Sequence, residues 1–231
     1  MSYSNGPKIV MDGLTLCLDA GNPKSYFGSG TSWCDLSGYN GTGTLTNGPT
    51  FDTEKGGCIS YDGADDTVSV PYQSAYSVTA MTCLMTVKTP ASFTGNFRAF
   101  FSKQGADRDF NYYAYSSNGD GVINNFHISS ARLSSFTSVV SIPGNLALNT
   151  WHHLGFAIGG GKVYYFLNGN IINSDGYTGT FNANNSYNLL VGSADNYWSG
   201  KIANCLFYNR VLSTNEFLQN YNAEKKRFGL S

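Results

Sequence analysis

Two adjacent histidines, His152 and His153, are the residues of this sequence most suggestive of chemistry. An imidazole acts as a general acid or base when a nucleophile and a carboxylate lie within hydrogen-bonding reach. Neighbouring residues of a β-strand point to opposite faces of the sheet, so these two cannot act together on one substrate. The sequence also lacks a Gly-x-Ser-x-Gly segment to position a serine nucleophile. We therefore expect one histidine to be packed and hydrogen-bonded, the other to face outward, and neither to be catalytic.

Glycoside hydrolysis requires two carboxyl groups about 5–9.5 Å apart across the scissile bond. The chain has only three glutamates: Glu54 in a Gly-Lys loop, and Glu216 and Glu224 near the C-terminus. Asp107 and Asp109 alternate as residues on one strand face do, but their surroundings, GADRDF, predict a solvated hairpin loop. We therefore predict that the chain is not an enzyme.

The segment DGADD places three carboxylates, Asp62, Asp65 and Asp66, close together in the sequence. Calcium takes several oxygen ligands, which clustered aspartates and turn carbonyls supply. The alternative is a turn in which Asp62 and Gly63 reverse the chain and a later aspartate caps it. We take the turn as the default, predict no other cofactor, and leave calcium open.

Aromatic side chains flanked by amides and carboxylates are typical of carbohydrate sites, because aromatic rings stack on the apolar face of a sugar. The segments SADNYWSG and NYYAYSSNGDG have this pattern. The candidate carbohydrate-binding residues are Trp198, Tyr197, Asn196, Asp195, Tyr113 and Tyr115. In each segment the alternative is an aromatic residue that closes one end of the fold, and a protein-binding surface uses the same residue types.

The elements that must position these residues are predicted to be strands. Of the 231 residues only 13% are charged and 15% are aromatic, and about a dozen short apolar runs are separated by Gly, Asn and Asp. This pattern indicates an all-β sandwich or barrel. Residues 154–158 and 163–167 alternate around a glycine turn, and Asn168-Gly169 predicts a type I′ turn into a third strand.

One short helix is predicted at the C-terminus, over residues 213–227. Ser213 followed by Glu216 is a capping box, and Phe217, Leu218 and Tyr221 form a narrow apolar stripe. Residues 1–12 are expected to be an N-terminal arm, and the whole of 1–231 one domain.

Charge and cysteine content exclude several classes of protein. The net charge is −1, and the one cationic cluster, residues 225–227, suits a helix C-terminus better than a nucleic-acid site. No segment is apolar enough to serve as a signal core or to insert in a membrane. The five cysteines are odd in number and form no Cys-x-x-Cys pair. We expect synthesis in a reducing cytoplasm, with most cysteines buried as small apolar residues.

Four segments resemble laminin-G-like domains of the concanavalin-A-like lectin/glucanase superfamily. They are NTWHHLGFAIGGGKVYYFLNGN, GKIANCLFYNRVLSTNEFLQNYNA, ISYDGADDTVSVP and, nearer the N-terminus, GLTLCLDAGNPKSYFGSGTSWCDLSGYNGTGTL. The last resembles a segment often attached to such domains in bacteriophage virion proteins. Together they cover residues 13–70 and 149–223, while 71–148 matches only in strand pattern. The resemblance implies a two-sheet antiparallel jelly-roll sandwich, a binding or structural role, and in some relatives one calcium ion at a sandwich rim.

These observations lead to one expected function and two alternatives. We expect a non-enzymatic component of a bacteriophage virion, as a capsid decoration or a tail or fibre protein, that displays a lectin-like domain at the virion surface. Its expected partners are other virion proteins and host-surface glycans, and we expect a homo-oligomer. The alternatives are a soluble carbohydrate-binding module and, less favoured, a glycan hydrolase or lyase.

Overall fold

The computed structural model describes residues 8–95, 97–104, 108–115, 121–130 and 136–231. Two eight-stranded sheets pack face to face, and every strand pairing within them is antiparallel. This confirms the predicted two-sheet antiparallel jelly-roll sandwich with one C-terminal helix. Two short 3₁₀ turns, η1 (Glu54–Gly56) and η2 (Ser74–Tyr76), are the helical segments described before residue 210.

The first sheet has the strand order β14-β13-β12-β7-β16-β5-β4, and β1 pairs with β16 beside this path. Its strands are β1 (Leu14–Asp19), β4 (Thr50–Asp52), β5 (Cys58–Asp62), β7 (Met81–Lys88), β12 (Trp151–Gly159), β13 (Lys162–Leu167), β14 (Asn170–Gly176) and β16 (Ser199–Tyr208).

The second sheet has the order β11-β10-β9-β8-β15-β6-β3-β2. Its strands are β2 (Ser32–Trp33), β3 (Gly43–Thr46), β6 (Thr67–Val70), β8 (Phe97–Gln104), β9 (Arg108–Tyr115), β10 (Ile123–Ser130), β11 (Phe136–Leu146) and β15 (Leu189–Val191).

The hairpin β12–β13 shows how local sequence produces the sheet. Leu154, Phe156 and Ile158 alternate along β12, and all three are buried in the core between the sheets. Asn168 and Gly169 have φ angles of 44° and 85°, so both adopt the left-handed backbone of the predicted type I′ turn. The turn leads directly into β14, which confirms the predicted meander.

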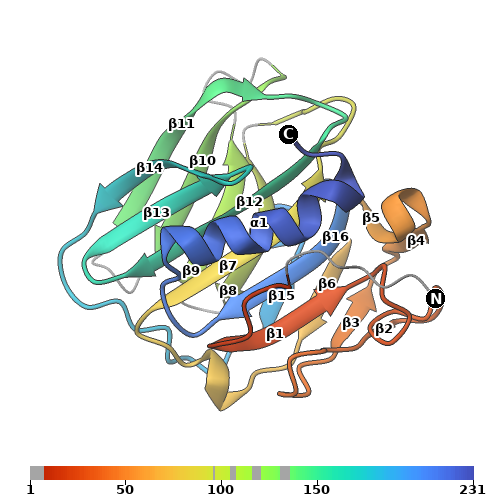
Figure 1. Ribbon diagram of the computed structural model, residues 1–231, viewed down its shortest axis with the longest axis horizontal. Coiled ribbons are helices and arrows are strands. Elements are labelled where there is room, and N and C mark those ends of the chain that lie inside the picture. The colour runs from red at the N-terminus through yellow and green to blue at the C-terminus, as the bar shows by residue number, and fades with distance from the viewer. Residues whose placement is uncertain (1–7, 96, 105–107, 116–120, 131–135) are drawn as a thin grey trace.

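Helix α1 (Thr214–Phe228) lies across the outer face of the first sheet (Figure 1). Phe217 stacks on Phe166 of β13 at 3.9 Å between ring centroids, and on His153 of β12 at 5.6 Å. Phe166 and Phe217 belong to a second apolar cluster, outside the core between the sheets. The helix therefore buries the face of β12 that the strand pattern alone leaves exposed.

The prediction that one histidine faces outward is wrong, because both are buried. Nε2 of His152 lies 3.1 Å from the carbonyl oxygen of Ala147. His153 is covered by α1, and its burial lowers its pKa to about 4, so its imidazole is neutral at pH 7. The two rings do point to opposite faces of β12, as expected.

The capping box of α1 is confirmed. The backbone N–H of Glu216 donates to Oγ of Ser213 at 3.4 Å, and that of Ser213 donates to Oε2 of Glu216 at 2.9 Å. The helix runs one residue further than predicted, to Phe228, and is followed by Gly229, whose φ of 69° is the left-handed conformation common at helix ends.

Replacing Ser213 with alanine is expected to lower the free energy of unfolding by about 1 kcal/mol, because the first turn loses a hydrogen-bond acceptor. Urea unfolding followed by circular dichroism measures the change. Ser174→Ala on the exposed strand β14 is the matched control, and its expected effect is smaller. Equal stabilities for both variants would show that the cap contributes nothing.

Four of the five cysteines, Cys17, Cys58, Cys83 and Cys205, are buried thiols on strands, as predicted. Burial raises the pKa of Cys17 and of Cys58 to about 12, so these thiols are unreactive. Across the described ranges, no helix combines the length and apolar character needed to cross a membrane.

Candidate functional site

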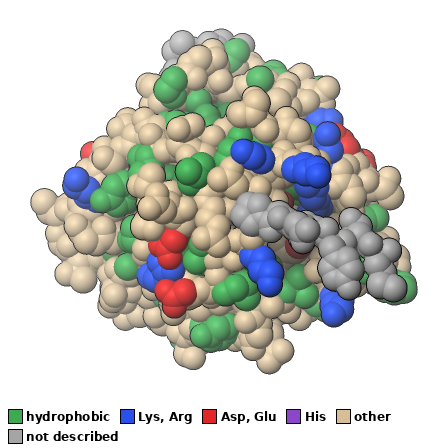
Figure 2. Space-filling view, viewed as in Figure 1, with side chains coloured by type: hydrophobic (Ala, Val, Ile, Leu, Met, Phe, Trp, Pro, Cys, Tyr) green, Lys and Arg blue, Asp and Glu red, His purple; other side chains and the backbone are tan. Residues whose placement is uncertain are grey.

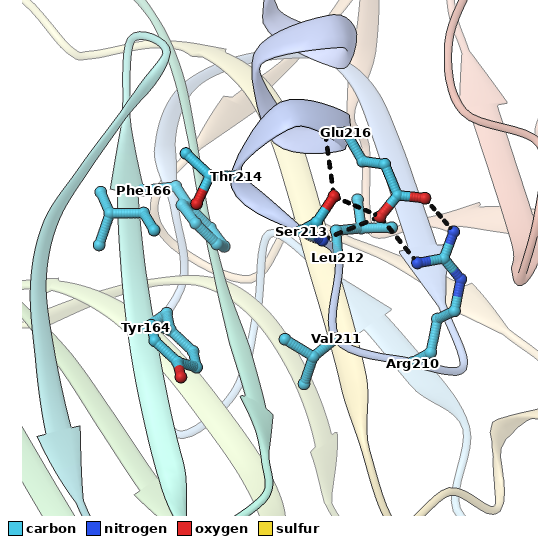
Figure 3. Close-up of a pocket in the computed structure, with 9 residues that line it drawn as sticks. Tyr164, Phe166, Arg210, Val211, Leu212, Ser213, Thr214 and Glu216 are labelled. Atoms are coloured by element: carbon cyan, nitrogen blue, oxygen red, sulfur yellow. Dashed lines mark hydrogen bonds and ion pairs between the residues drawn. The ribbon is translucent and has the colours of Figure 1, made fainter.

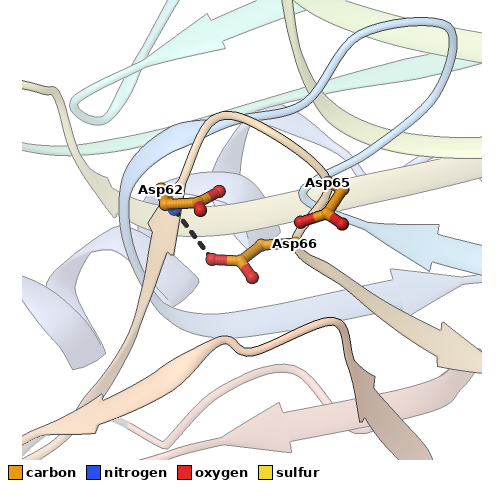
Figure 4. A group of neighbouring side chains, drawn as sticks. All are labelled: Asp62, Asp65 and Asp66. Carbon is orange, nitrogen blue, oxygen red and sulfur yellow. Dashed lines mark hydrogen bonds between the residues drawn. The ribbon is translucent and has the colours of Figure 1, made fainter.

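The three aspartates converge on the turn between β5 and β6 (Figure 4). Their ligand atoms all lie within 4.8 Å of one another. The backbone N–H of Asp62 donates to Oδ2 of Asp66 at 2.8 Å, and that of Ala64 donates to Oδ1 of Asp62 at 2.7 Å. These hydrogen bonds confirm that the segment forms the expected turn. The turn also gathers three carboxylates at one point.

The electrostatics of this turn favour a positive charge. Asp66 is buried, and burial together with the nearby carboxylates of Asp62 and Asp65 raises its pKa, against the hydrogen bond from the Asp62 N–H. Asp62 and Asp66 each commit one carboxylate oxygen to the turn, and Asp65 is exposed. Carboxylate oxygens grouped in this way fit a calcium ion, which would offset the repulsion between them.

Residues 192–198, the rim loop, form the second part of the site. The backbone N–H of Trp198 donates to the carbonyl oxygen of Gly192 at 2.7 Å, and Ser193 bridges to Tyr197. Gly192 has a φ of 81°, and a Cβ there would collide with the ring of Tyr61. The hydroxyl of Ser102 on β8 donates to the carbonyl oxygen of Ser193 at 2.8 Å. These contacts make the rim loop a fixed platform.

Trp198 does not stack on a ligand as predicted, because it is fully buried. Its ring lies 4.6 Å from that of Phe100 in the core between the sheets. An indole buries a large apolar surface, so Trp198 anchors the rim loop from below. The remaining candidates of this segment form its accessible tip: Asp195 is exposed, and Asn196 and Tyr197 are half-buried.

Tyr113 is also buried and cannot serve as an open stacking surface. Its hydroxyl donates to Oδ2 of Asp195 at 3.3 Å, and Nδ2 of Asn111 donates to that hydroxyl at 2.8 Å. Tyr113, on β9 of the second sheet, therefore positions Asp195. Tyr115 ends β9, and its side chain lies outside the described residues.

The structure brings the aspartate turn and the rim loop together, which the sequence does not reveal. The hydroxyls of Thr67 and Ser193 contact each other, and Ser199 pairs with Asp62 across β16 and β5. A Cβ on Gly63 would lie 2.7 Å from Cβ of Ser199. The two segments are thus one rim, although more than 120 residues separate Thr67 from Ser193.

The outer face of the second sheet extends inward from this rim. Ser129 lies opposite Asn111, which lies opposite Ser102, and His127 lies opposite Tyr113 with stacked rings 5.4 Å apart. Directly paired residues of antiparallel strands share a face, so these hydroxyl, amide and aromatic groups lie on one side of the sheet. All five side chains are buried, so they form a polar layer beside the rim and are not an open surface for a ligand.

The carboxylates considered for hydrolysis are committed elsewhere. Asp109 is fully buried in β9 and pairs with Nζ of Lys103 at 3.0 Å, so the predicted solvated loop is wrong at this residue. Asp107 lies outside the described residues. Burial raises the pKa of Glu54, but hydrogen bonds from Lys201, Lys88 and Trp151 outweigh this and lower the pKa to about 2. Among the described residues, neither Asp109 nor Glu54 is arranged as a catalytic acid.

These features define a lectin-like jelly-roll sandwich whose candidate site lies at one rim. The sequence profile of the Concanavalin A-like lectin/glucanases superfamily matches residues 62–217, more than half of the chain, and the protein belongs to this superfamily. A search of curated proteins by sequence finds no match.

Three solved structures illustrate the fold. Domain 4 of AbnA, a GH43 extracellular arabinanase from Geobacillus stearothermophilus solved in complex with arabinotriose, has a TM-score of 0.68 at 17% identity, over 90% of this chain and 98% of that one. The botulinum neurotoxin serotype G binding domain has a TM-score of 0.69 at 13% identity, over 90% of this chain and 50% of that one. The Trypanosoma rangeli sialidase in complex with sialic acid has a TM-score of 0.66 at 12% identity, over 93% of this chain and 33% of that one.

This chain therefore spans about half of the toxin binding domain and a third of the sialidase. Identities this low establish a shared fold and carry no residue assignments.

Proposed function

We propose that this chain is a non-catalytic glycan-binding module, and that its binding site is the rim formed by the aspartate turn and the rim loop. The observation that carries the proposal is the accessible tip of the rim loop. There Tyr197, Asn196 and Asp195 are presented on a rigid backbone, with Asp195 held by Tyr113. An aromatic ring beside amide and carboxylate acceptors is the arrangement that sugar binding requires.

The structural neighbours support this proposal. One is an arabinanase domain in complex with arabinotriose, and others are the binding domains of toxins. Each of these domains shares the sandwich fold and binds a ligand or is named as a binding domain. The described carboxylates of this chain have structural partners at Glu54, Asp109 and Glu216, which favours binding without hydrolysis.

The place of action that we propose is the surface of a bacteriophage virion. The support is the resemblance of residues 13–45 to segments attached to such domains in virion proteins, together with the small share of charged residues, 13% of the chain. On the face drawn in Figure 2 the charged side chains are scattered among uncharged ones. Assembly in the host cytoplasm fits the reduced cysteines. A homo-oligomer would cover exposed strand edges such as β14. Capsid decoration and a tail or fibre position are both compatible with these features.

Glycan binding is tested by Tyr197→Ala, which is expected to weaken the affinity for a glycan found on a host-polysaccharide array by about tenfold or more. Tyr197→Phe keeps the ring and is expected to retain most of the affinity. His152→Ala and His153→Ala should leave the affinity of the folded fraction unchanged. Binding that is unaffected by Tyr197→Ala would contradict the assignment of the site, and release of reducing sugar would contradict a non-catalytic role.

We also propose that a bound calcium ion stabilises this rim. At a free calcium concentration of 100 times Kd, the ion is expected to stabilise the fold by about 2.7 kcal/mol. Calorimetric unfolding with calcium and with a chelator measures this. Asp65→Asn, a change at an exposed residue, should abolish the stabilisation, whereas Asp175→Asn on β14 should not. Identical unfolding up to about 1 mM calcium would remove the ion from the proposal.

A soluble carbohydrate-binding module is the second candidate. The arabinanase domain favours it, because the structural match extends over 98% of that domain. Mass spectrometry of purified phage particles separates the two, since a virion component is found in the particle. Sedimentation then reports the oligomeric state. A monomer that is missing from particles and binds a glycan would favour the soluble module.

A further inference from the structure

A groove lies where helix α1 begins, on the outer face of the first sheet. We call it the helix-start groove. One side is formed by Tyr164 and Phe166 of β13 with Ile171 of β14, and the other by the segment that enters the helix (Figure 3). The second side consists of Arg210, Val211, Leu212, Ser213, Thr214 and Glu216. The cavity volume is about 540 Å³, within the range of small-molecule sites.

We propose that the helix-start groove is a second binding site, which takes one or two rings of a neutral saccharide. It does not depend on the rim proposed above. β13 and β14 lie at one end of the strand order of the first sheet and β5 lies near the other, so the groove and the rim cannot form one continuous surface.

The apolar side of the groove suits the face of a sugar ring. Tyr164 is half-buried and Ile171 is 39% exposed, so both present carbon surface to solvent. Phe166 lies beneath them and is fixed by its stack on Phe217. α1 starts too late in the chain to cover this part of β13 and β14, which leaves the surface open (Figure 3).

The polar side of the groove offers hydrogen-bond donors. The first N–H groups of a helix have no partner within the helix. The N–H of Glu216 is taken by Ser213, and that of Phe217 by the carbonyl oxygen of Ser213. The N–H groups of Thr214 and Asn215 precede them in the first turn, and of these two residues Thr214 lines the groove, with its hydroxyl at the same edge (Figure 3). These donors match the oxygen acceptors of a sugar.

The charges at the groove compensate one another, and this selects a neutral ligand. Both terminal nitrogens of Arg210 donate to Glu216, at 3.0 and 2.5 Å, and its Nε pairs with Asp12 at 2.9 Å. A guanidinium held by two carboxylates attracts an anionic sugar only weakly, and Glu216 repels it. A cationic ligand gains little, because Arg210 already occupies Glu216.

The test is a titration of the ¹⁵N-labelled chain with arabinotriose, cellotriose and, as the acidic comparator, sialyllactose. We expect one of the neutral sugars to shift the amide signals of Thr214 and Asn215, and sialyllactose to shift them less. Tyr164→Ala should weaken this response by about tenfold or more, because the apolar wall is lost. Thr214→Val, which removes one hydroxyl at constant shape, should weaken it less.

Two controls make the result decisive. Phe27→Ala removes an aromatic side chain that is 85% exposed and outside both sites, and it should change nothing. Tyr197→Ala acts at the rim and should leave the Thr214 and Asn215 response intact, so that either proposal can fail alone. The inference is overturned if neither neutral sugar moves these amides, if folded Tyr164→Ala responds like the wild type, or if sialyllactose is the tighter ligand.

Discussion

Replacing Asp109 with asparagine is expected to lower the free energy of unfolding by about 3–5 kcal/mol. Lys103 and Asp109 are both fully buried, and Nζ of Lys103 lies 3.0 Å from Oδ2 of Asp109. Nζ also donates to the carbonyl oxygens of Tyr76 and Ala183, at 3.1 and 2.6 Å. Without its carboxylate partner, the buried ammonium of Lys103 still carries the cost of desolvation and loses most of the electrostatic attraction that offsets this cost. Urea unfolding at constant pH measures the change.

Two further variants test whether the unpaired buried charge causes the loss of stability. Asp175→Asn makes the same chemical change at an exposed residue and should alter the stability by less than about 0.5 kcal/mol. Lys103→Met combined with Asp109→Leu removes both charges and should recover much of the loss, because a buried pair can often be replaced by apolar residues. A loss below about 1 kcal/mol in Asp109→Asn would show that the pair contributes little.

Glu224→Gln is expected to stabilise the protein by about 2–3 kcal/mol above pH 7 and to have almost no effect below pH 4.5. Burial and the nearby carboxylate of Asp19 raise the pKa of Glu224 to about 7, although Arg227 and Asn204 act in the opposite direction. Its Oε2 atom is buried without a hydrogen-bond partner among the described residues. In the unfolded chain the same carboxyl titrates near 4.5.

The direction of the pH dependence follows from these two values. Between pH 4.5 and 7 the folded protein holds a proton that the unfolded chain has lost, so the contribution of Glu224 to stability falls as the pH rises. Above pH 7 both states are ionised and the penalty is constant. Glutamine remains neutral throughout, so the two stability curves should separate only above pH 4.5. Thermal unfolding across pH 4–8 measures this, and parallel curves would refute the expectation.

Local patterns in the sequence were sufficient for the elements whose geometry depends on near neighbours. The alternation of Leu154, Phe156 and Ile158 identified β12, because successive side chains of a strand point to opposite faces. Asn168-Gly169 identified a turn because both residues tolerate positive φ. Ser213 and Glu216 identified the start of α1 because a capping box needs only four consecutive residues. The all-β class follows from the repetition of such signals.

Only the tertiary structure decided which of these residues are accessible. His153 and Trp198 lie in strand-like and loop-like sequence, yet α1 covers the first and the sandwich core encloses the second. The Asp109 loop prediction failed for the same reason, since its partner Lys103 lies on the adjacent strand. The rim itself joins residues 62–66 to residues 192–199 through strand pairing distant in sequence. The neighbours of a residue in the sequence specify its backbone conformation. Its burial depends on which distant element packs against it, and no short stretch of the sequence records that contact.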